Sequence, residues 1–136
     1  MRHPLIAPVL ACALLAGCVA NDTPVTTRPA PFVDRDRALI QSAIIDDMKD
    51  PGAAQLRKLV AYDLSEGQGR VLCGEVNGKN SFGAYGGFQP FFLRIKDGRA
   101  VTSYVGAAAS DDVWGRLATK GCTAAASGQM MVAGAK

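Results

Sequence analysis

The dipeptide Asp97-Gly98 is the feature that most constrains the fold, because it stands between two segments typical of β-strands. Residues 88–96 (FQPFFLRIK) precede it and residues 99–105 (RAVTSYV) follow it. Both segments are rich in the aromatic and β-branched side chains that strands favour. An Asp-Gly pair in this position favours a two-residue hairpin turn. We therefore expect an antiparallel hairpin in the second half of the chain.

The register that this turn imposes gives the hairpin one apolar face and one face that is partly exposed to solvent. The expected neighbours on the apolar face are Ile95 and Ala100, Leu93 and Thr102, and Phe91 and Tyr104. The opposite face carries Arg94, Lys96, Arg99 and Ser103.

Two further strands and a helix precede the hairpin. Residues 56–64 and 70–77 have strand composition. Residues 34–49 repeat apolar side chains at helical spacing, and Asp50-Pro51 ends that helix because a residue before proline avoids helical angles. The pattern predicts an α+β domain: an N-terminal helix, a three- to four-stranded antiparallel meander covered on one face, and a C-terminal helix.

The C-terminal helix is predicted from the sequence SDDVWGRLATKGC. Ser110 is the expected N-cap, and Asp111-Asp112 suit the positive end of the helix. Gly121 is expected to end the helix in a left-handed conformation. Cys122 would then lie just past the helix end.

The first eighteen residues resemble a bacterial lipoprotein signal peptide. A short basic start, Met1-Arg2-His3, precedes an apolar run over residues 4–16 that is too short to span a bilayer comfortably. The run ends in Leu15-Ala16-Gly17-Cys18, which is similar to the lipobox cleaved by signal peptidase II. The resemblance implies removal of residues 1–17 and lipidation of Cys18, with diacylglycerol and palmitate-type chains. The alternative is an ordinary secretory signal with a chance cysteine.

The same resemblance implies a location in the cell envelope. Val19 follows the cysteine where an aspartate would favour retention in the inner membrane. We therefore expect a lipid-anchored outer-membrane protein facing the periplasm, if the source is Gram-negative.

Composition divides the remainder of the chain into three parts. Residues 18–33 are rich in Thr, Pro and Ala, show no helical or strand period, and are expected to be a flexible, lipidated tether. Residues 34–122 are expected to form a single globular domain. Residues 123–136 are weakly patterned and expected to be disordered, with residues 129–132 a candidate short strand.

The chain has four cysteines, of which Cys12 leaves with the signal and Cys18 would carry lipid. Cys73 and Cys122 remain, and two cysteines in an oxidising envelope most simply form a disulfide. The alternatives are two free thiols or half of a metal site.

The charge balance and the lack of histidine exclude several functions. Fifteen Lys and Arg oppose twelve Asp and Glu, and loss of Arg2 leaves fourteen, interspersed along the chain. Nucleic-acid binding is therefore not expected. The only histidine is His3, so histidine-based nucleophilic catalysis and the usual zinc sites are excluded from the mature chain. We expect no cofactor, no metal site and no catalytic residue.

Residues 71–92 (VLCGEVNGKNSFGAYGGFQPFF) carry a second resemblance, which covers roughly residues 48–92. The segment is similar to one in a family of small uncharacterised bacterial secreted proteins and lipoproteins, with the pattern C-G-x-V-N-x-K-N-x-x-G-G-Y-x-G after an upstream Lys-Asp-Pro. Lys49-Asp50-Pro51 matches that upstream element, whereas Ala84 departs from the second glycine of the pair. The family brings no activity, so no residue inherits a catalytic role from it.

The glycine-rich segment itself has three interpretations. It is a decorated hairpin in which Glu75 pairs with a cation such as Lys79 or Arg94, or a binding loop. The loop would present Lys79, Asn80, Phe82 and Tyr85 to a partner. In the third interpretation Glu75 is a general acid or base whose pKa is raised by burial.

These observations favour a non-catalytic envelope lipoprotein that acts as a binding or adaptor module. Its expected partners are the membrane, through the lipid, and an envelope protein or peptidoglycan. The alternatives are an inhibitor of a periplasmic or host enzyme such as lysozyme, to whose lipoprotein inhibitors residues 81–85 (SFGAY) bear a faint likeness, and a carboxylate enzyme that acts on cell-wall glycan.

Overall fold

The structure is a computed structural model that describes residues 22–107 and 111–133. It contains one six-stranded antiparallel sheet with the strand order β5-β4-β3-β2-β1-β6. The strands are β1 (Asp22–Ala30), β2 (Gln55–Leu64), β3 (Arg70–Asn77), β4 (Gln89–Lys96), β5 (Arg99–Val105) and β6 (Gln129–Ala133). The helices are α1 (Asp34–Ile40), continued by a π-helical turn, η1 (Gln41–Ile45), a 3-10 turn, η2 (Pro51–Ala53), and α2 (Val113–Ala126).

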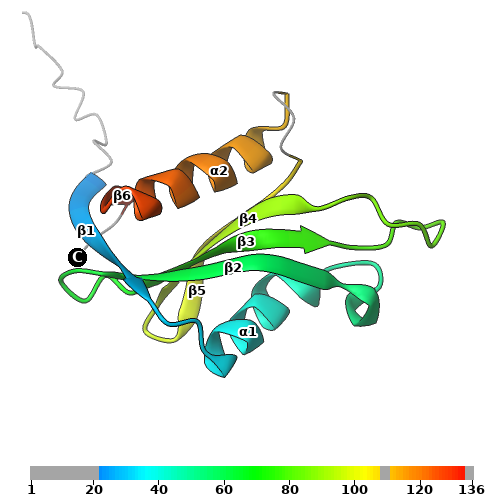
Figure 1. Ribbon diagram of the computed structural model, residues 1–136, viewed down its shortest axis with the longest axis horizontal. Helices are drawn as coiled ribbons and strands as arrows, with labels where there is room; N and C mark the ends of the chain where they lie inside the picture. Colours follow the sequence, from blue (N-terminus) through cyan, green and yellow to red (C-terminus); the bar gives the residue numbers. More distant parts are fainter. Residues whose placement is uncertain (1–21, 108–110, 134–136) are drawn as a thin grey trace, which may run out of the picture.

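The sheet is sandwiched between the helices, with α2 on one face and α1 on the other (Figure 1). Strand β3 is buried on both faces of the sheet. Its successive side chains Val71, Leu72 and Cys73 point to opposite faces, and all three are buried. Val71 and Cys73 pack in the cluster beneath α2. Leu72 packs against Ile40 and its neighbours in the cluster beneath α1. Both the Cys73 face and the Leu72 face of β3 therefore belong to the core.

The predicted fold class, a meander of three or four strands covered on one face, is wrong. Strands β2 to β5 lie where the sequence placed them, but two more strands, β1 and β6, complete the sheet. β1 forms from the segment expected to be a tether. β6 forms within the segment expected to be disordered, at the candidate short strand over residues 129–132. The folded region therefore extends beyond residues 34–122 at both ends.

Burial explains why these two segments form strands. Val25 and Thr27 alternate inward on β1, and Met130 and Val132 alternate inward on β6. All four are buried, and β1 pairs with β6 through its first half and with β2 through its second half. β6 is hydrogen-bonded in the sheet to β1 alone, and the inward side chains of both strands pack against residues of β3, β4 and α2. These contacts come from distant parts of the chain, so neither segment has a clear strand pattern alone.

The β4–β5 hairpin keeps the predicted turn but not the whole predicted register. Ile95 lies opposite Ala100 as expected. Beyond that pair, β5 contains one extra residue, so Leu93 faces Ser103, not Thr102. This bulge moves Tyr104 opposite Phe92, on the α2 face of the sheet, where the two rings stack with centroids 5.9 Å apart.

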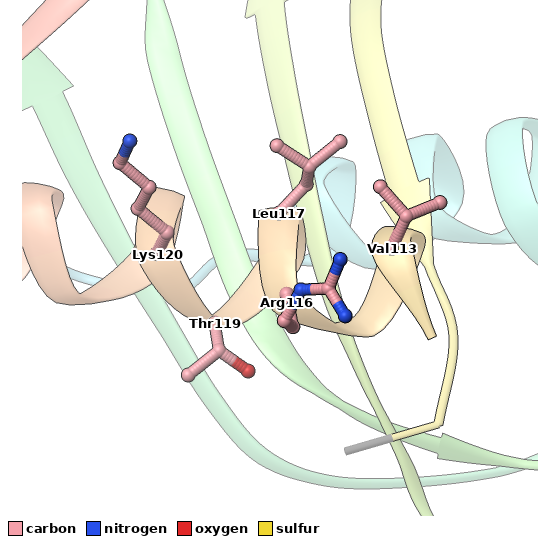
Figure 2. A pocket seen from close by; sticks show the side chains of 5 residues that line it. All are labelled: Val113, Arg116, Leu117, Thr119 and Lys120. Carbon is pink, nitrogen blue, oxygen red and sulfur yellow. The ribbon is translucent and has the colours of Figure 1, made fainter. Parts of the chain in front are cut away.

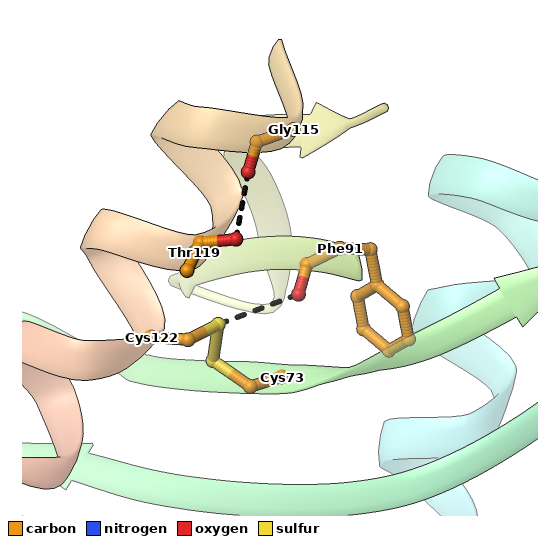
Figure 3. The surroundings of a disulfide bond; sticks show 5 residues. All are labelled: Cys73, Phe91, Gly115, Thr119 and Cys122. Carbon is orange, nitrogen blue, oxygen red and sulfur yellow. Dashed lines mark hydrogen bonds between the residues drawn. A yellow bond between two sulfur atoms is a disulfide. The ribbon is translucent and has the colours of Figure 1, made fainter. Parts of the chain in front are cut away.

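The disulfide between Cys73 and Cys122 is confirmed, with a Cα–Cα distance of 5.9 Å (Figure 3). It joins the central strand β3 to α2. Cys122 lies inside α2, because the helix continues to Ala126 and does not end at Gly121. Gly121 instead allows close packing, since a Cβ there would lie 2.7 Å from the ring of Phe92.

Asp112 caps the N-terminus of α2; the predicted N-cap Ser110 lies outside the described residues. The Asp112 carboxylate accepts hydrogen bonds from the main-chain N–H groups of Gly115, Ala107 and Trp114. These bonds, the one from Gly115 foremost, lower the pKa of Asp112. The carboxylate thus ties the helix to the end of the β5 strand.

The cap predicts how stability depends on pH. A carboxyl whose pKa is lowered by folding stabilises the folded state above its unfolded pKa, and that contribution is lost as the pH falls through the folded pKa, below about pH 4. Asp112→Asn keeps a good N-cap but cannot titrate, so we expect a flatter stability profile in acid. Chemical denaturation at a series of pH values measures it. An Asp112→Asn profile as steep in acid as that of the wild type would contradict this role of the cap.

Candidate functional site

The loop between β3 and β4 projects beyond the end of the sheet as a narrow extension of the hairpin (Figure 1). Main-chain hydrogen bonds continue into it, from Asn80 N to Ala84 O at 2.8 Å and from Gly86 N to Gly78 O at 3.2 Å. A β-bridge also pairs Lys79 with Tyr85. The loop, residues 78–88, is therefore an ordered extension of the hairpin, called the arm below, and not a flexible connection.

Asn80 organises the tip of this arm. Its side-chain oxygen accepts hydrogen bonds from Phe82 N at 2.9 Å and from Ala84 N at 3.1 Å. Gly83 adopts a positive φ of 78° between them, which any other residue would adopt only with strain. The bend thus falls at Gly83, so the alanine at position 84 does not disturb it. Asn80 has a structural role in the loop.

Tyr85 fixes the arm to the body of the protein. Its hydroxyl donates to the carbonyl oxygen of Ala53 at 3.0 Å, and Lys79 Nζ lies 5.6 Å from the centre of its ring. At the base of the arm, Gly87 N donates to Asn77 Oδ1 at 3.0 Å. These contacts hold Lys79 and Tyr85 against each other, although Tyr85 remains 44% exposed.

Phe82 differs from the other three predicted loop residues because it is 95% exposed. It lies at the tip, where Asn80 orders the main chain on both sides of it. An aromatic side chain so exposed on an ordered arm is unusual, since burial of such a ring contributes about 1.5–3 kcal/mol. Of the four residues Lys79, Asn80, Phe82 and Tyr85, Phe82 is the one fully available to a partner.

Glu75 lies at the base of the arm, between two basic side chains of β2. Its carboxylate forms ion pairs with Arg57 and with Lys58, the latter at 3.1 Å. The expected partners, Lys79 and Arg94, are not the ones used. The guanidinium of Arg57 also lies 3.7 Å above the ring of Phe88.

A β-bulge brings both basic residues to the same carboxylate. Between Arg57 and Val60 the ladder of β2 with β3 shifts by one residue, and Lys58 adopts a positive φ of 54°. In a regular strand, neighbouring side chains would point to opposite faces of the sheet. The bulge therefore creates a cluster of Arg57, Lys58 and Glu75 that no local pattern in the sequence indicates.

The electrostatics of Glu75 differ from those that the general-acid interpretation expects. Hydrogen bonds from Arg57 and then Lys58 lower the pKa of the Glu75 carboxyl, the reverse of the shift expected from burial. Its side chain is 24% exposed. Glu75 borders a groove of about 420 Å³ between α2 and the strands, with the disulfide among its lining residues. The carboxylate is thus held ionised and neutralised by its neighbours.

A second ion-pair cluster involves Asp63, whose carboxylate contacts Arg70 at 2.6 Å. Arg70 also binds Asp36, which is almost fully buried on α1. This cluster docks α1 against the sheet and is structural. Within residues 22–107 and 111–133, no group of three or more His, Cys, Asp or Glu side chains could hold a metal ion.

The outer face of α2 forms a second shallow concavity, of about 540 Å³. Figure 2 shows Val113 and Leu117 beside the basic side chains Arg116 and Lys120 on this helix. Trp114, on the adjacent turn, is 55% exposed and stacks on Tyr104 with ring centroids 6.0 Å apart. Trp114 therefore only partly covers the edge of the sheet.

The lipid-anchor prediction concerns a signal peptide over residues 1–17 and a lipid on Cys18, all of which lie outside the described residues. In the part of the chain that the structure describes, no helix is long and apolar enough to cross a membrane. Comparison of the chain with family models, with curated proteins and with solved structures found no match.

Proposed function

We propose that this protein is a lipid-anchored bacterial envelope protein that binds a partner protein through the tip of the β3–β4 arm. The observation that carries the proposal is the 95% exposure of Phe82 on an arm ordered by Asn80 and fixed by Tyr85. Binding energy at protein interfaces concentrates in a few anchors, often aromatic, that enter pockets of the partner. An arm already ordered also loses little conformational entropy on binding.

The position of the arm supports this role. Only residues 19–21 separate Cys18 from the first residue of β1, so a lipid on Cys18 would hold the domain within about 15 Å of the bilayer. β1 begins at the end of the molecule opposite the arm (Figure 1). The anchor at one end would leave Phe82 facing away from the membrane, towards the periplasm in a Gram-negative cell.

The anchor has its own test. We expect the mature chain to begin at Cys18 and to carry lipid, which mass spectrometry of the N-terminal peptide measures. Two or more acyl chains are needed for stable attachment. An unmodified Cys18, or a mature chain that begins elsewhere, would contradict this part of the proposal.

Co-isolation tests the binding role. The full chain is solubilised gently from its native membranes as wild type, Phe82→Ala and Met131→Ala. Met131 is 57% exposed on β6, far from the arm, and is the matched control. We expect one protein to copurify with the wild type and with Met131→Ala and to be lost from Phe82→Ala. The proposal fails if Phe82→Ala retains the partner.

The shape of the arm favours one second candidate, inhibition of an enzyme. A narrow convex arm with a single aromatic ring at its tip suits insertion into a concave active site, such as that of lysozyme. The full chain should then inhibit the enzyme at stoichiometric concentration, and Phe82→Ala should relieve the inhibition. Equal inhibition by both proteins would exclude the arm as the inhibitory element.

A further inference from the structure

Arg94 is an almost fully buried arginine that forms no ion pair with an acidic side chain of the described residues. It is 6% exposed, on β4, and faces α2. Its Nε and Nη2 groups donate to the main-chain oxygen of Gln68 at 3.3 and 3.2 Å, and Nη2 also donates to the side-chain oxygen of Gln68 at 3.1 Å. These acceptors are neutral. Among residues 22–107 and 111–133, no carboxylate forms an ion pair with Arg94.

Arg70, which is half-buried, has the acidic partners that Arg94 lacks among the described residues. Its guanidinium contacts the carboxylates of Asp36 and Asp63, which offset the cost of removing the charge from water. Arg94 is more deeply buried and lacks that compensation, and burial lowers its pKa. A buried charge without a counter-charge is costly, which suggests that an anion from outside completes the site.

Arg94 lines a groove of about 500 Å³ that is open to such an anion. The groove lies between the two edge strands, with Thr102 and Tyr104 of β5 on one side and residues of β6 on the other. Leu117 and Lys120 of α2 line it as well. Its volume falls within the range of small-molecule sites. It is separate from the arm, which projects from the opposite end of the molecule from β6 (Figure 1).

The residues that line the groove indicate which chemical class of ligand it would bind. Arg94 and the exposed Lys120 supply two positive charges. Asp22, exposed at the first position of β1, is the one carboxylate among the lining residues that the structure describes. Most of the remaining lining is apolar and includes Leu117, Ala124, Met130, Met131 and Val132. This combination fits an acid group attached to an apolar body better than it fits an inorganic anion.

We propose that this groove binds a medium-chain carboxylic acid, with the carboxylate paired to Arg94 and the hydrocarbon chain against the side chains of α2 and β6. Lys120, at the rim, adds a second positive charge. A planar guanidinium matches the geometry of a carboxylate. Methionine side chains adapt readily to the shape of a flexible chain. This binding is independent of the partner proposed for Phe82.

The test uses the full chain in detergent with three probes: octanoate, 1-octanol, which lacks the charge, and acetate, which lacks the chain. Calorimetry measures affinity. Trp114 gives a second readout, because it is the only tryptophan of the chain and stacks on Tyr104 in the groove. We expect octanoate to bind more tightly than either control. Equal affinity for octanoate and 1-octanol would overturn the proposal.

Variants connect the signal to the groove. Arg94→Gln should weaken octanoate binding by about tenfold or more, because a charge-assisted hydrogen bond is lost. Arg99→Gln, an exposed arginine of β5 outside the groove, is the control and should bind normally. Octanoate also partitions into the detergent micelles, but this lowers its free concentration equally for all variants and does not affect the comparison between them. A folded Arg94→Gln protein with unchanged affinity would overturn the proposal.

Lys120→Gln covers the case in which Arg94→Gln does not fold, since Lys120 is exposed on α2 and its replacement should leave the core intact. A several-fold weaker affinity for octanoate supports the groove, whereas unchanged affinity in this variant contradicts it.

Discussion

Replacing Cys73 and Cys122 together by alanine is expected to lower the free energy of unfolding by about 4 kcal/mol. The disulfide spans 49 residues of sequence, and a cross-link of that length restricts the unfolded chain by about this amount in the chain-entropy model. It also joins β3, at the centre of the sheet, to α2, whose docking covers one of the two cores. Urea denaturation of the oxidised wild type and the double variant measures the difference.

The wild type treated with a reductant provides the control for this prediction. If the cross-link itself stabilises the fold, reduction should destabilise the wild type by nearly the same amount and leave the double variant unchanged. A double variant as stable as the oxidised wild type would show that packing alone holds α2 on the sheet.

Replacing Phe91 by alanine is expected to cost about 3–5 kcal/mol, the range observed when a buried phenylalanine is truncated. Phe91 is fully buried in the cluster beneath α1. Its ring packs against Gly74 of β3 so closely that a Cβ there would lie 2.9 Å from it. Truncation would open a cavity between α1 and the sheet, over the backbone of Gly74, where the paired strands cannot easily move to fill it.

Phe82→Ala is the matched control for Phe91→Ala, since it removes the same side chain from a position that is 95% exposed. We expect its free energy of unfolding to stay within about 0.5 kcal/mol of the wild type. Thermal or urea denaturation of the two variants side by side measures the contrast. A large loss of stability in Phe82→Ala would mean that Phe82 packs in solution, which would undermine its use as a binding probe.

The sequence predicted those elements whose patterns are local. Strands β2 to β5 lie within one residue of their predicted bounds, because each combines apolar or alternating side chains with a clear turn signal. The disulfide was predicted by elimination among four cysteines and is confirmed. The predicted sheet lacked β1 and β6, because these two strands pair with each other from opposite ends of the chain. Pro24 and Pro29 in β1 also made that segment resemble a linker.

Two β-bulges explain why the sequence did not predict the residues that meet at the candidate sites. The bulge after Arg57 brings Lys58 to Glu75, and the bulge in β5 brings Tyr104 to the face with Arg94. A one-residue shift of a strand moves every later side chain to the other face. Neither bulge has a glycine or proline to mark it, so the charge cluster at Glu75 and the groove at Arg94 depend on geometry that the sequence pattern does not show.

The loop shows the opposite case. Its glycines, Asn80 and Tyr85 were expected either to shape it or to bind a partner, and the structure assigns Asn80 and Tyr85 to shaping and fixing the arm. Phe82 is left as the exposed anchor. Composition marks such a loop as special, but only the hydrogen bonds distinguish the residues that build it from the residue that it presents.

Site-specific photo-cross-linking at position 82 tests the central claim most directly. A photoreactive benzoyl-phenylalanine replaces Phe82 in the full chain, expressed in its native cells, and a second protein carries it at position 131 on β6. The account predicts one discrete cross-linked product from position 82 that position 131 does not give. No product from position 82, or the same products from both positions, would contradict it.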